Sequence, residues 1–173
     1  RRSGLRKSAS RGFPPIAAPD ARVLVLGSLP GRASLAARQY YAQPHNDFWR
    51  IMGELFDAGP DVPYAERADR LRASGIALWD VCKEAVRPGS LDAAIELATV
   101  VTNDFKRFFS EHPRIVHVCV NGGTAHRLYV RRVQPLLPEQ LASLPLHLLP
   151  STSPAHTMPF ADKLAAWREA LPA

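Results

Sequence analysis

The stretch that decides the fold is Arg22–Trp49, RVLVLGSLPGRASLAARQYYAQPHNDFW. It opens with the apolar run Val23–Leu26, which predicts a parallel strand that is buried on both faces. The strand breaks at Gly27, and a turn that contains Pro30 and Gly31 follows. Two tyrosines, a polar Gln-Pro-His-Asn run and an aromatic pair come next. A packed core does not need so many polar and aromatic groups directly after a strand, so we interpret this segment as a pocket for a flat, polar ligand.

The rest of the chain alternates short apolar runs with amphipathic ones. Further strands are expected at 76–82, 115–120 and 146–149. The 3.6-residue pattern predicts helices over 48–56, 64–74, 124–133 and 162–170, and another that begins at Phe105 with Asn103 or Asp104 as its cap. This order predicts a three-layer α/β/α sandwich around a central, four-stranded, mainly parallel sheet.

The length and charge of the chain limit its organisation and its partners. The 173 residues fit one domain, which we expect over 13–173. Residues 1–12, RRSGLRKSASRG, carry five cations and no acid, and we expect them to form a disordered basic arm. The net charge of +6 favours a polyanionic partner, although a merely basic soluble protein is an open alternative.

Several classes of protein are not supported by the sequence. Cys82 and Cys119 lie far apart in apolar runs, which is typical of core residues in a reducing compartment. Without a CxxC pair, an HExxH motif or histidines four residues apart, we expect no metal, no iron–sulfur cluster and no other cofactor. No apolar run reaches the ~20 residues that cross a bilayer, so we expect no membrane partner and a cytoplasmic, nucleoid-associated protein.

Turn residues and polar residues follow three of the four expected strands: Gly27-Ser28, Asn121-Gly122-Gly123 and Pro150–His156. In parallel sheets ligands bind beyond the carboxyl ends of the strands, so these three loops should meet at one mouth. The first loop, GSLPGRAS, fits neither the P-loop nor the GxGxxG pattern, and no GxSxG elbow occurs. Amides, hydroxyls and aromatic rings on a basic protein suit a nucleobase and its neighbouring phosphates.

Five segments together resemble one family: GSLPGRASL, QYYAQPHNDFWRI, LWDVCKEAVRPGSLDAAI, VCVNGG and STSPAH. They are similar to the uracil-DNA glycosylase superfamily, and most similar to its hypoxanthine-type branch, the DNA-deoxyinosine glycosylases. The resemblance spans roughly Val23 to His156. It implies a uracil-DNA glycosylase-like fold and a monomeric, monofunctional enzyme of base excision repair. Such an enzyme flips a deaminated base, uracil or hypoxanthine, out of DNA and hydrolyses its N-glycosidic bond.

The resemblance also implies catalytic roles. Ser28 and Leu29 occupy the two first-loop positions at which other branches hold an acidic residue and a water-activating Asn. The role of placing the water therefore passes to Asn46, whose amide is not basic but can hold a water through its carbonyl oxygen. His156 is the second catalytic candidate. Backbone N–H groups near Gly27–Leu29, with either Asn121 or His156, would stabilise the negative charge of the departing base.

Two groups of binding residues follow from the same resemblance. The base would stack on Tyr41 and be read by Asn121, and the base-binding group is Gly27, Ser28, Leu29, Tyr41, Phe48 and Asn121. The DNA phosphates would meet Pro30, Gly31, Ser34, Ser151 and Ser153. The chain departs from the family pattern at Gln43, where the family usually has His, and at His156, where Asn or a variable residue is usual.

Other interpretations of these residues stay open. Asn46 would also serve as the cap of the helix that begins at Phe48. Tyr40 and Tyr41 point in different directions along the chain, so at least one should be a core residue. Phe48 and Trp49 would also fit as core residues. Arg87 and Asp92 could form a structural pair that braces the first loop. Two further functions also remain: a DNA-binding module of the same fold without catalysis, and a small-molecule nucleoside hydrolase.

Overall fold

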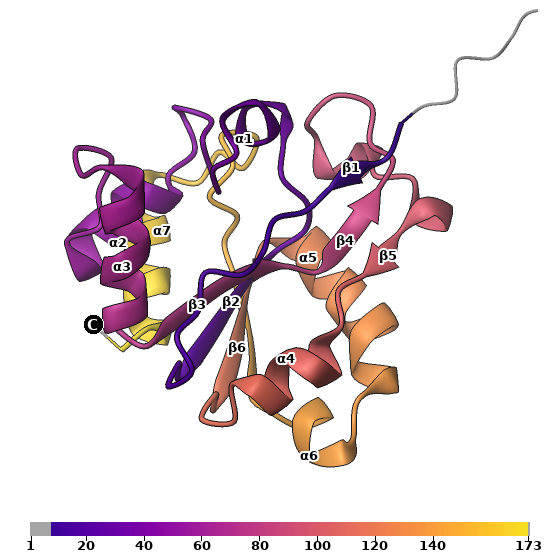
Figure 1. Ribbon diagram of the computed structural model, residues 1–173. Coiled ribbons are helices and arrows are strands. Elements are labelled where there is room, and N and C mark those ends of the chain that lie inside the picture. The colour runs from indigo at the N-terminus through magenta and orange to yellow at the C-terminus, as the bar shows by residue number, and fades with distance from the viewer. Residues whose placement is uncertain (1–7, 173) are drawn as a thin grey trace, which may run out of the picture.

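A four-stranded parallel sheet forms the centre of the computed structural model, which describes residues 8–172 (Figure 1). Its strand order is β3-β2-β6-β7, with β3 at Ile76–Asp80, β2 at Val23–Gly27, β6 at His117–Asn121 and β7 at Leu146–Leu149. All three neighbouring pairs are parallel, and Leu24 in β2 faces Ala77 on one side and Val118 on the other. The predicted four-stranded sheet is therefore confirmed, and its carboxyl ends lie at one edge.

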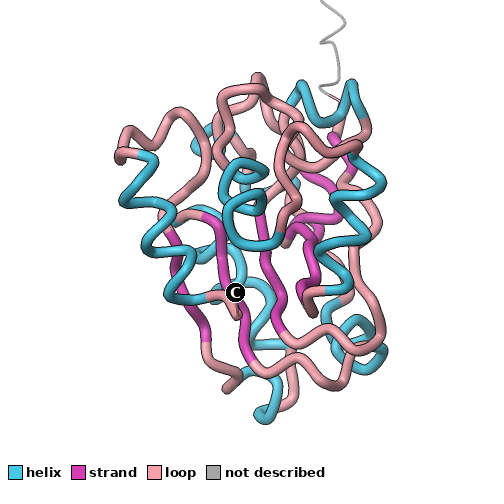
Figure 2. The backbone as a smooth tube through the Cα atoms, turned by 90° about the vertical axis from the view of Figure 1, so that its left-hand side faces the viewer, coloured by secondary structure: helices cyan, strands magenta, loops and turns pink. Residues whose placement is uncertain are grey.

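Helices cover both faces of this sheet (Figure 1). One face carries α2 (Phe48–Phe56), α3 (Tyr64–Ala73) and α7 (Phe160–Ala170), and the other carries α4 (Phe105–Glu111), α5 (Gly123–Leu128) and α6 (Glu139–Ala142). Successive residues of β2 point to opposite faces, so Val23 and Val25 enter one core while Leu24 and Leu26 enter the other. Figure 2 shows the strands in the interior of the molecule with helices and loops around them. The three-layer prediction is confirmed.

A second, small sheet was not predicted. Its order is β1-β4-β5, from Ser10–Arg11, Cys82–Ala85 and Val101–Thr102, and both pairings are antiparallel. The sequence suggested one strand over 76–82, but the chain turns at Val81, whose N–H donates to the carbonyl of Gly27 at 2.8 Å. Cys82 then starts β4 instead of ending β3.

The expected disordered arm needs a correction at its carboxyl-terminal part. Residues 1–7 lie outside the described residues, but Ser10–Arg11 form β1, which pairs with Glu84 and Ala85 of β4. The Gly12 N–H also donates to the carbonyl of Lys83 at 2.8 Å. The expectation is wrong here because a polar segment gains order from a strand edge that lies about 70 residues away.

Two helical details also differ from the prediction. The segment after Gly31 contains α1 (Arg32–Ala37), where we expected only a loop. The helix predicted over 124–133 changes after Leu128 into a π-helical turn, η3 (Tyr129–Val133), which buries Tyr129 and Val133. Both cysteines are free and buried, as predicted. Over residues 8–172, no helix is long and apolar enough to cross a membrane.

The cap of α4 gives a direct test of the helix assignments. The side chain of Asp104 accepts a hydrogen bond from the Arg107 N–H at 3.1 Å, as the sequence predicts for one of its two candidates. Asp104→Ala should lower the free energy of unfolding by about 1 kcal/mol, because one terminal N–H loses its acceptor. Urea denaturation would measure this loss. Asp104→Ser, which keeps an acceptor, should stay within a few tenths of a kcal/mol of the parent, and an equal loss in both variants would contradict the capping role.

Candidate functional site

The side chain of Asn121, the last residue of β6, connects three segments at the carboxyl ends of the strands. Its Nδ2 donates to Thr152 Oγ1 at 2.9 Å and to the Tyr41 hydroxyl at 3.2 Å. Its Oδ1 accepts from the Thr152 N–H at 2.9 Å. Asn121 and Thr152 are both buried, so these bonds are shielded from water. The base-reading role of Asn121 remains a prediction.

Tyr41 is held in an unusual backbone conformation beside Asn121. Its φ of 53° lies in the left-handed region, which non-glycine residues rarely adopt. Its ring stacks on Phe48 with 4.2 Å between the centroids. Burial raises the pKa of the Tyr41 phenol, so the group stays neutral and its proton remains available for a hydrogen bond. Strain of this kind is often found where a side chain must be aimed at a ligand.

Phe48 is not placed to contact a base, although we expected it in the base-binding group. Its side chain is fully buried between the ring of Tyr41 and the edge of Trp167, whose centroid lies 6.0 Å away. The first turn of α2 points this side chain into the core below Tyr41. Phe48 therefore supports the expected stacking platform from behind.

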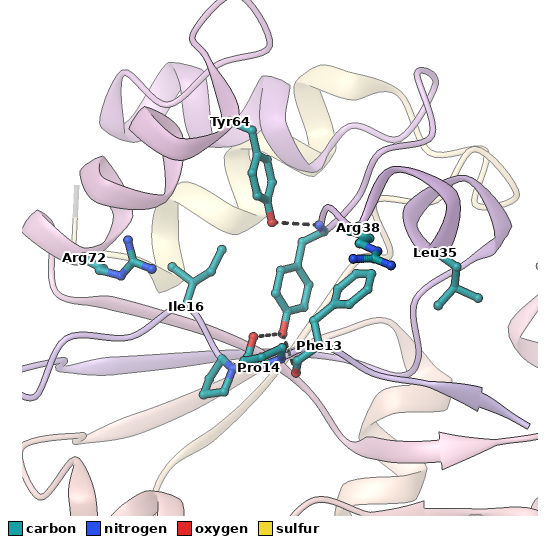
Figure 3. Close-up of a pocket in the computed structure, with 9 residues that line it drawn as sticks. Phe13, Pro14, Ile16, Leu35, Arg38, Tyr64 and Arg72 are labelled. Atoms are coloured by element: carbon teal, nitrogen blue, oxygen red, sulfur yellow. Dashed lines mark hydrogen bonds between the residues drawn. The ribbon is translucent and has the colours of Figure 1, made fainter.

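Tyr40 points away from Tyr41 and is a core residue, as the sequence predicted for at least one of the pair. Its hydroxyl donates to the carbonyl of Pro14 at 2.9 Å, and its N–H donates to the Tyr64 hydroxyl at 3.0 Å. Tyr40 lines a separate cavity of about 510 Å³, which Figure 3 shows between Phe13, Tyr64 and the guanidinium groups of Arg38 and Arg72.

Asn46 lies in the loop that the network of Asn121 holds in place. Its Oδ1 accepts from the Phe48 N–H, the first N–H of α2, at 2.9 Å. Asn46 therefore satisfies one terminal donor of the helix, as the capping alternative predicted, although the N-cap residue itself is Asp47. The next residue, Asp47, donates its N–H to the carbonyl of Thr152 at 2.9 Å. This bond fixes the loop of Asn46 beside the segment that Asn121 binds. One lone pair of the half-buried Oδ1 remains for a water, and the catalytic role of Asn46 remains a prediction.

Lys163 in α7 connects the same two loops and was not found from the sequence. Its side chain is only 2% exposed, and its Nζ lies 3.4 Å from Asp47 Oδ2 and 3.2 Å from the carbonyl of Ser153. Four residues later, Trp167 Nε1 donates to the carbonyl of Pro150 at 3.0 Å. A lysine one helical turn from a buried tryptophan was the available signal, because that spacing places the cation on the apolar face.

The first loop is braced by a buried arginine. The Arg87 guanidinium donates to the carbonyls of Leu29, at 3.3 Å, and of Pro30, and lies 3.3 Å from Asp92 Oδ1. The same carboxylate oxygen accepts from the Ser28 hydroxyl at 2.7 Å. The predicted pair of Arg87 and Asp92 is confirmed. Because Leu29 is buried in the core and the Ser28 hydroxyl is bound, this loop offers mainly backbone geometry.

The predicted phosphate-binding residues lie in different environments. Ser34 is buried, and its Oγ accepts from the Ala42 N–H at 3.1 Å, which does not fit a phosphate contact. Pro30 is also buried, whereas Gly31 lies partly exposed at the start of α1. The partly exposed Ser151 and Ser153 accept from the N–H groups of Ser153 and Ala155, each at 3.2 Å. Their hydroxyl protons remain available for a phosphate.

His156 and Gln43 are exposed residues of the flanking loops. The His156 N–H donates to the carbonyl of Ser153 at 3.0 Å, which closes a turn. Within residues 8–172, no side-chain contact of His156 is described, and it is not joined to the network of Asn121. The Gln43 side chain accepts from the His45 N–H and stabilises the loop before Asn46. The catalytic role of His156 remains a prediction.

Asp80 also lies at the carboxyl end of a strand of the central sheet, and it was not singled out from the sequence. It is the last residue of β3, beside Gly27, and is only 4% exposed. Its Oδ2 is buried without a hydrogen-bond partner among the described residues. Burial, and after it the charge of Asp92, raise the pKa of this carboxyl to about 7, while Arg87 acts in the opposite direction. The signal was an acid at the end of the apolar run IALW.

Gly27 allows the close approach of side chains above the end of β2. A Cβ on Gly27 would lie 2.5 Å from Asp80 Oδ1 and 2.7 Å from the Tyr41 hydroxyl. Both oxygens therefore lie over this backbone position, and any larger residue would displace one of them. A row of groups crosses the ends of β3, β2 and β6: the carboxyl of Asp80, the backbone of Gly27 with the Tyr41 hydroxyl above it, and the amide of Asn121. We call this row the mouth. Over residues 8–172, no group of three His, Cys, Asp or Glu side chains is placed to hold a metal ion.

Comparisons with known proteins agree with this geometry. The family model of the uracil DNA glycosylase superfamily matches residues 14–172. A hypoxanthine DNA glycosylase of Methanosarcina barkeri (strain Fusaro / DSM 804) is 32% identical over 163 residues, which are 92% of this chain and 96% of that protein. A hypoxanthine DNA glycosylase of Methanosarcina acetivorans is 37% identical over 116 residues, 66% of this chain and 72% of that protein.

A solved structure is similar over nearly the whole chain. The solution NMR structure of a proposed uracil DNA glycosylase from Methanosarcina acetivorans superposes with a TM-score of 0.74 and 32% identity. The match covers 94% of this chain and 98% of that one. The sheet order, the mouth at its carboxyl edge and the matched family lead to one conclusion. The chain belongs to the uracil DNA glycosylase superfamily and is a DNA N-glycosylase.

Proposed function

We propose that this glycosylase excises hypoxanthine from DNA, and uracil more slowly, by flipping the base into the mouth and hydrolysing its N-glycosidic bond. The two relatives of known name are hypoxanthine DNA glycosylases, and one of them aligns with 92% of the chain. The order of preference rests on these relatives. A purine needs the larger pocket, and uracil then fits with fewer contacts.

One observation carries the proposal: a single buried residue, Thr152, is bound by both sides of the mouth. Its N–H and hydroxyl bond Asn121, while its carbonyl accepts from the Asp47 N–H at 2.9 Å. The loop that carries Tyr41 and Asn46 is thereby fixed relative to Asn121 at the end of β6. A flipped base stacked on Tyr41 would place its sugar near this loop, where Asn46 would hold the attacking water.

The chemistry follows from this arrangement. As the bond between C1′ and the base breaks, the sugar develops oxocarbenium character and the base takes up negative charge. Fixed dipoles of the mouth, including the backbone N–H groups near Gly27–Leu29, would stabilise that charge. Water held by Asn46 Oδ1 then adds to C1′ and leaves an abasic site. The net charge of +6 and the hydroxyls of Ser151 and Ser153 support DNA as the polyanion that is bound.

Removal of the proposed water-binding group tests the mechanism. Asn46→Ala should lower the rate of hypoxanthine excision by at least about 100-fold, because the water loses its position, while affinity for the DNA changes little. Single-turnover excision and fluorescence anisotropy would measure these two quantities.

A matched variant separates this effect from the capping role of Asn46. Asn46→Ser keeps an acceptor for the Phe48 N–H and should recover most of the roughly 1 kcal/mol of stability that Asn46→Ala loses, but not its excision rate. If Asn46→Ser recovered the excision rate together with the stability, Asn46 would act only by bonding the Phe48 N–H.

Lys163 should matter for both folding and excision. Lys163→Met leaves the Asp47 carboxylate without its buried cation, so we expect a loss of stability on the order of 3 kcal/mol. Excision should also fall, because the loops of Asn46 and Ser153 lose one of their two links and keep only the bond from the Asp47 N–H to the Thr152 carbonyl. The double variant Lys163→Met with Asp47→Asn removes both charges and should recover part of the stability. Thermal unfolding that is no better in the double variant would contradict this charge pairing.

The substrate can be tested with a set of oligonucleotides that carry hypoxanthine, uracil, xanthine or adenine, each single- and double-stranded. We expect abasic sites to form fastest at hypoxanthine, with binding that weakens as salt is raised, because phosphate contacts release counterions. Free deoxyinosine should be hydrolysed far more slowly than the same nucleotide in DNA. Equal rates would favour a nucleoside hydrolase, and salt-sensitive binding without any abasic product would favour a non-catalytic DNA-binding module.

A further inference from the structure

The carboxyl of Asp80 is a buried acid that faces the mouth and has no described partner of opposite charge. Its Oδ2 makes no hydrogen bond among the described residues, and its Oδ1 lies over Gly27 close to the Tyr41 hydroxyl. The nearest cation, Arg87, directs its guanidinium to the carbonyls of Leu29 and Pro30 and to Asp92. An ionised carboxylate at this position would be costly, because neither a cation nor a full set of donors compensates it.

The backbone around Asp80 is fixed, so this placement does not result from a mobile end. The carbonyl of Asp80 accepts from Asn103 Nδ2 at 2.7 Å, and Asp80 pairs with Gly27 in the sheet register. The next residue, Val81, donates its N–H to the carbonyl of Gly27 at 2.8 Å. The sheet thus holds the carboxyl at the edge where the substrate is proposed to enter. Among the described residues, the Asp80 side chain makes no hydrogen bond that would give it a structural role.

We propose that Asp80 is the general acid of the excision reaction, which protonates a ring nitrogen of the departing base. This role rests on the proposed function and deepens it. The bond between C1′ and the base breaks with its electron pair going to the base, and the proton of Asp80 passes to that base. The oxygen of water bonds C1′, and the proton that this water releases restores the carboxyl. Asn46 positions the water, and Asp80 supplies the proton on the leaving-group side.

The surroundings of Asp80 keep its proton in place near neutral pH. The charged groups that shift the pKa of Asp80 are the Asp92 carboxylate, which raises it, and the Arg87 guanidinium, which lowers it. The other titratable groups nearby are the phenols of Tyr40, Tyr41 and Tyr64 and the Cys82 thiol, whose pKa values the charge of Asp80 raises. Burial and the charge of Asp92 raise the pKa of Asp80 to about 7, against the smaller effect of Arg87. An acid with a pKa near the working pH can both hold and release its proton, which suits general acid catalysis.

The isosteric variant Asp80→Asn tests the proposal through rate and pH together. In the parent enzyme the single-turnover rate of hypoxanthine excision should fall as pH rises through about 7, because the donor ionises. Asp80→Asn should be slower by on the order of 100-fold at pH 6 and should lack this fall. Asp69→Asn, the same change at an exposed position of α3, should keep both the parent rate and its pH profile.

Each other outcome has a definite meaning. A parent-like rate and profile in Asp80→Asn would overturn the proposal, and so would a parent rate that rises with pH through this range, which would make Asp80 a base. If Asp80→Asn does not fold, carbon-detected NMR of the parent decides: a carboxyl that is already ionised at pH 5 would overturn the proposal. Absence of hypoxanthine excision in the parent would instead refute the proposed function, so the two failures are distinguishable.

Discussion

The side-chain amide of Asn121 makes three hydrogen bonds in a buried place, and the arrangement of the mouth depends on them. Its two N–H groups bind Thr152 Oγ1 and the Tyr41 hydroxyl, and its oxygen binds the Thr152 N–H. The carbonyl of Thr152 then fixes the loop of Asn46 through Asp47. A residue at the end of one strand thus positions two loops that are distant in sequence. Loss of any one bond would leave a buried polar group unsatisfied, which makes the network cooperative.

The buried side chains of Lys163, Arg87 and Asp80 lie at this edge of the sheet, and their environments differ. Lys163 is paired with Asp47, and Arg87 with Asp92 and two carbonyls, so each cation has compensation. Both cations hold loops together. Asp80 lacks such compensation at Oδ2, and its pKa is raised accordingly. Paired cations suit the role of fixing loops, and an unpaired acid with a raised pKa suits the role of moving a proton. Both kinds of group lie at the same edge of the sheet.

The sequence predicted the central sheet and most helices because apolar runs and amphipathic patterns are local signals. It missed β1 and β5, which are two-residue strands that become ordered only through pairing with β4. For the site, the strand pattern predicted that loops after the strands meet, and Asn121 does contact both Tyr41 and Thr152. The roles that the resemblance implies for Tyr41, Asn121 and Asn46 stay predictions. It could not show that Phe48 lies behind Tyr41, because the direction of a side chain depends on packing. Lys163 and Asp80 were missed, since their partners and their burial arise from segments far away in the chain.

The central claim is that the bonds of Asn121 build the mouth before DNA arrives and persist when the base enters. A crystal structure of the protein with DNA that carries a non-hydrolysable deoxyinosine analogue tests this most directly. The account predicts a flipped base stacked on Tyr41, with both bonds between Asn121 and Thr152 retained at close to 2.9 Å. A complex in which Asn121 releases Thr152 to bind the base, or in which the base stacks away from Tyr41, would contradict it.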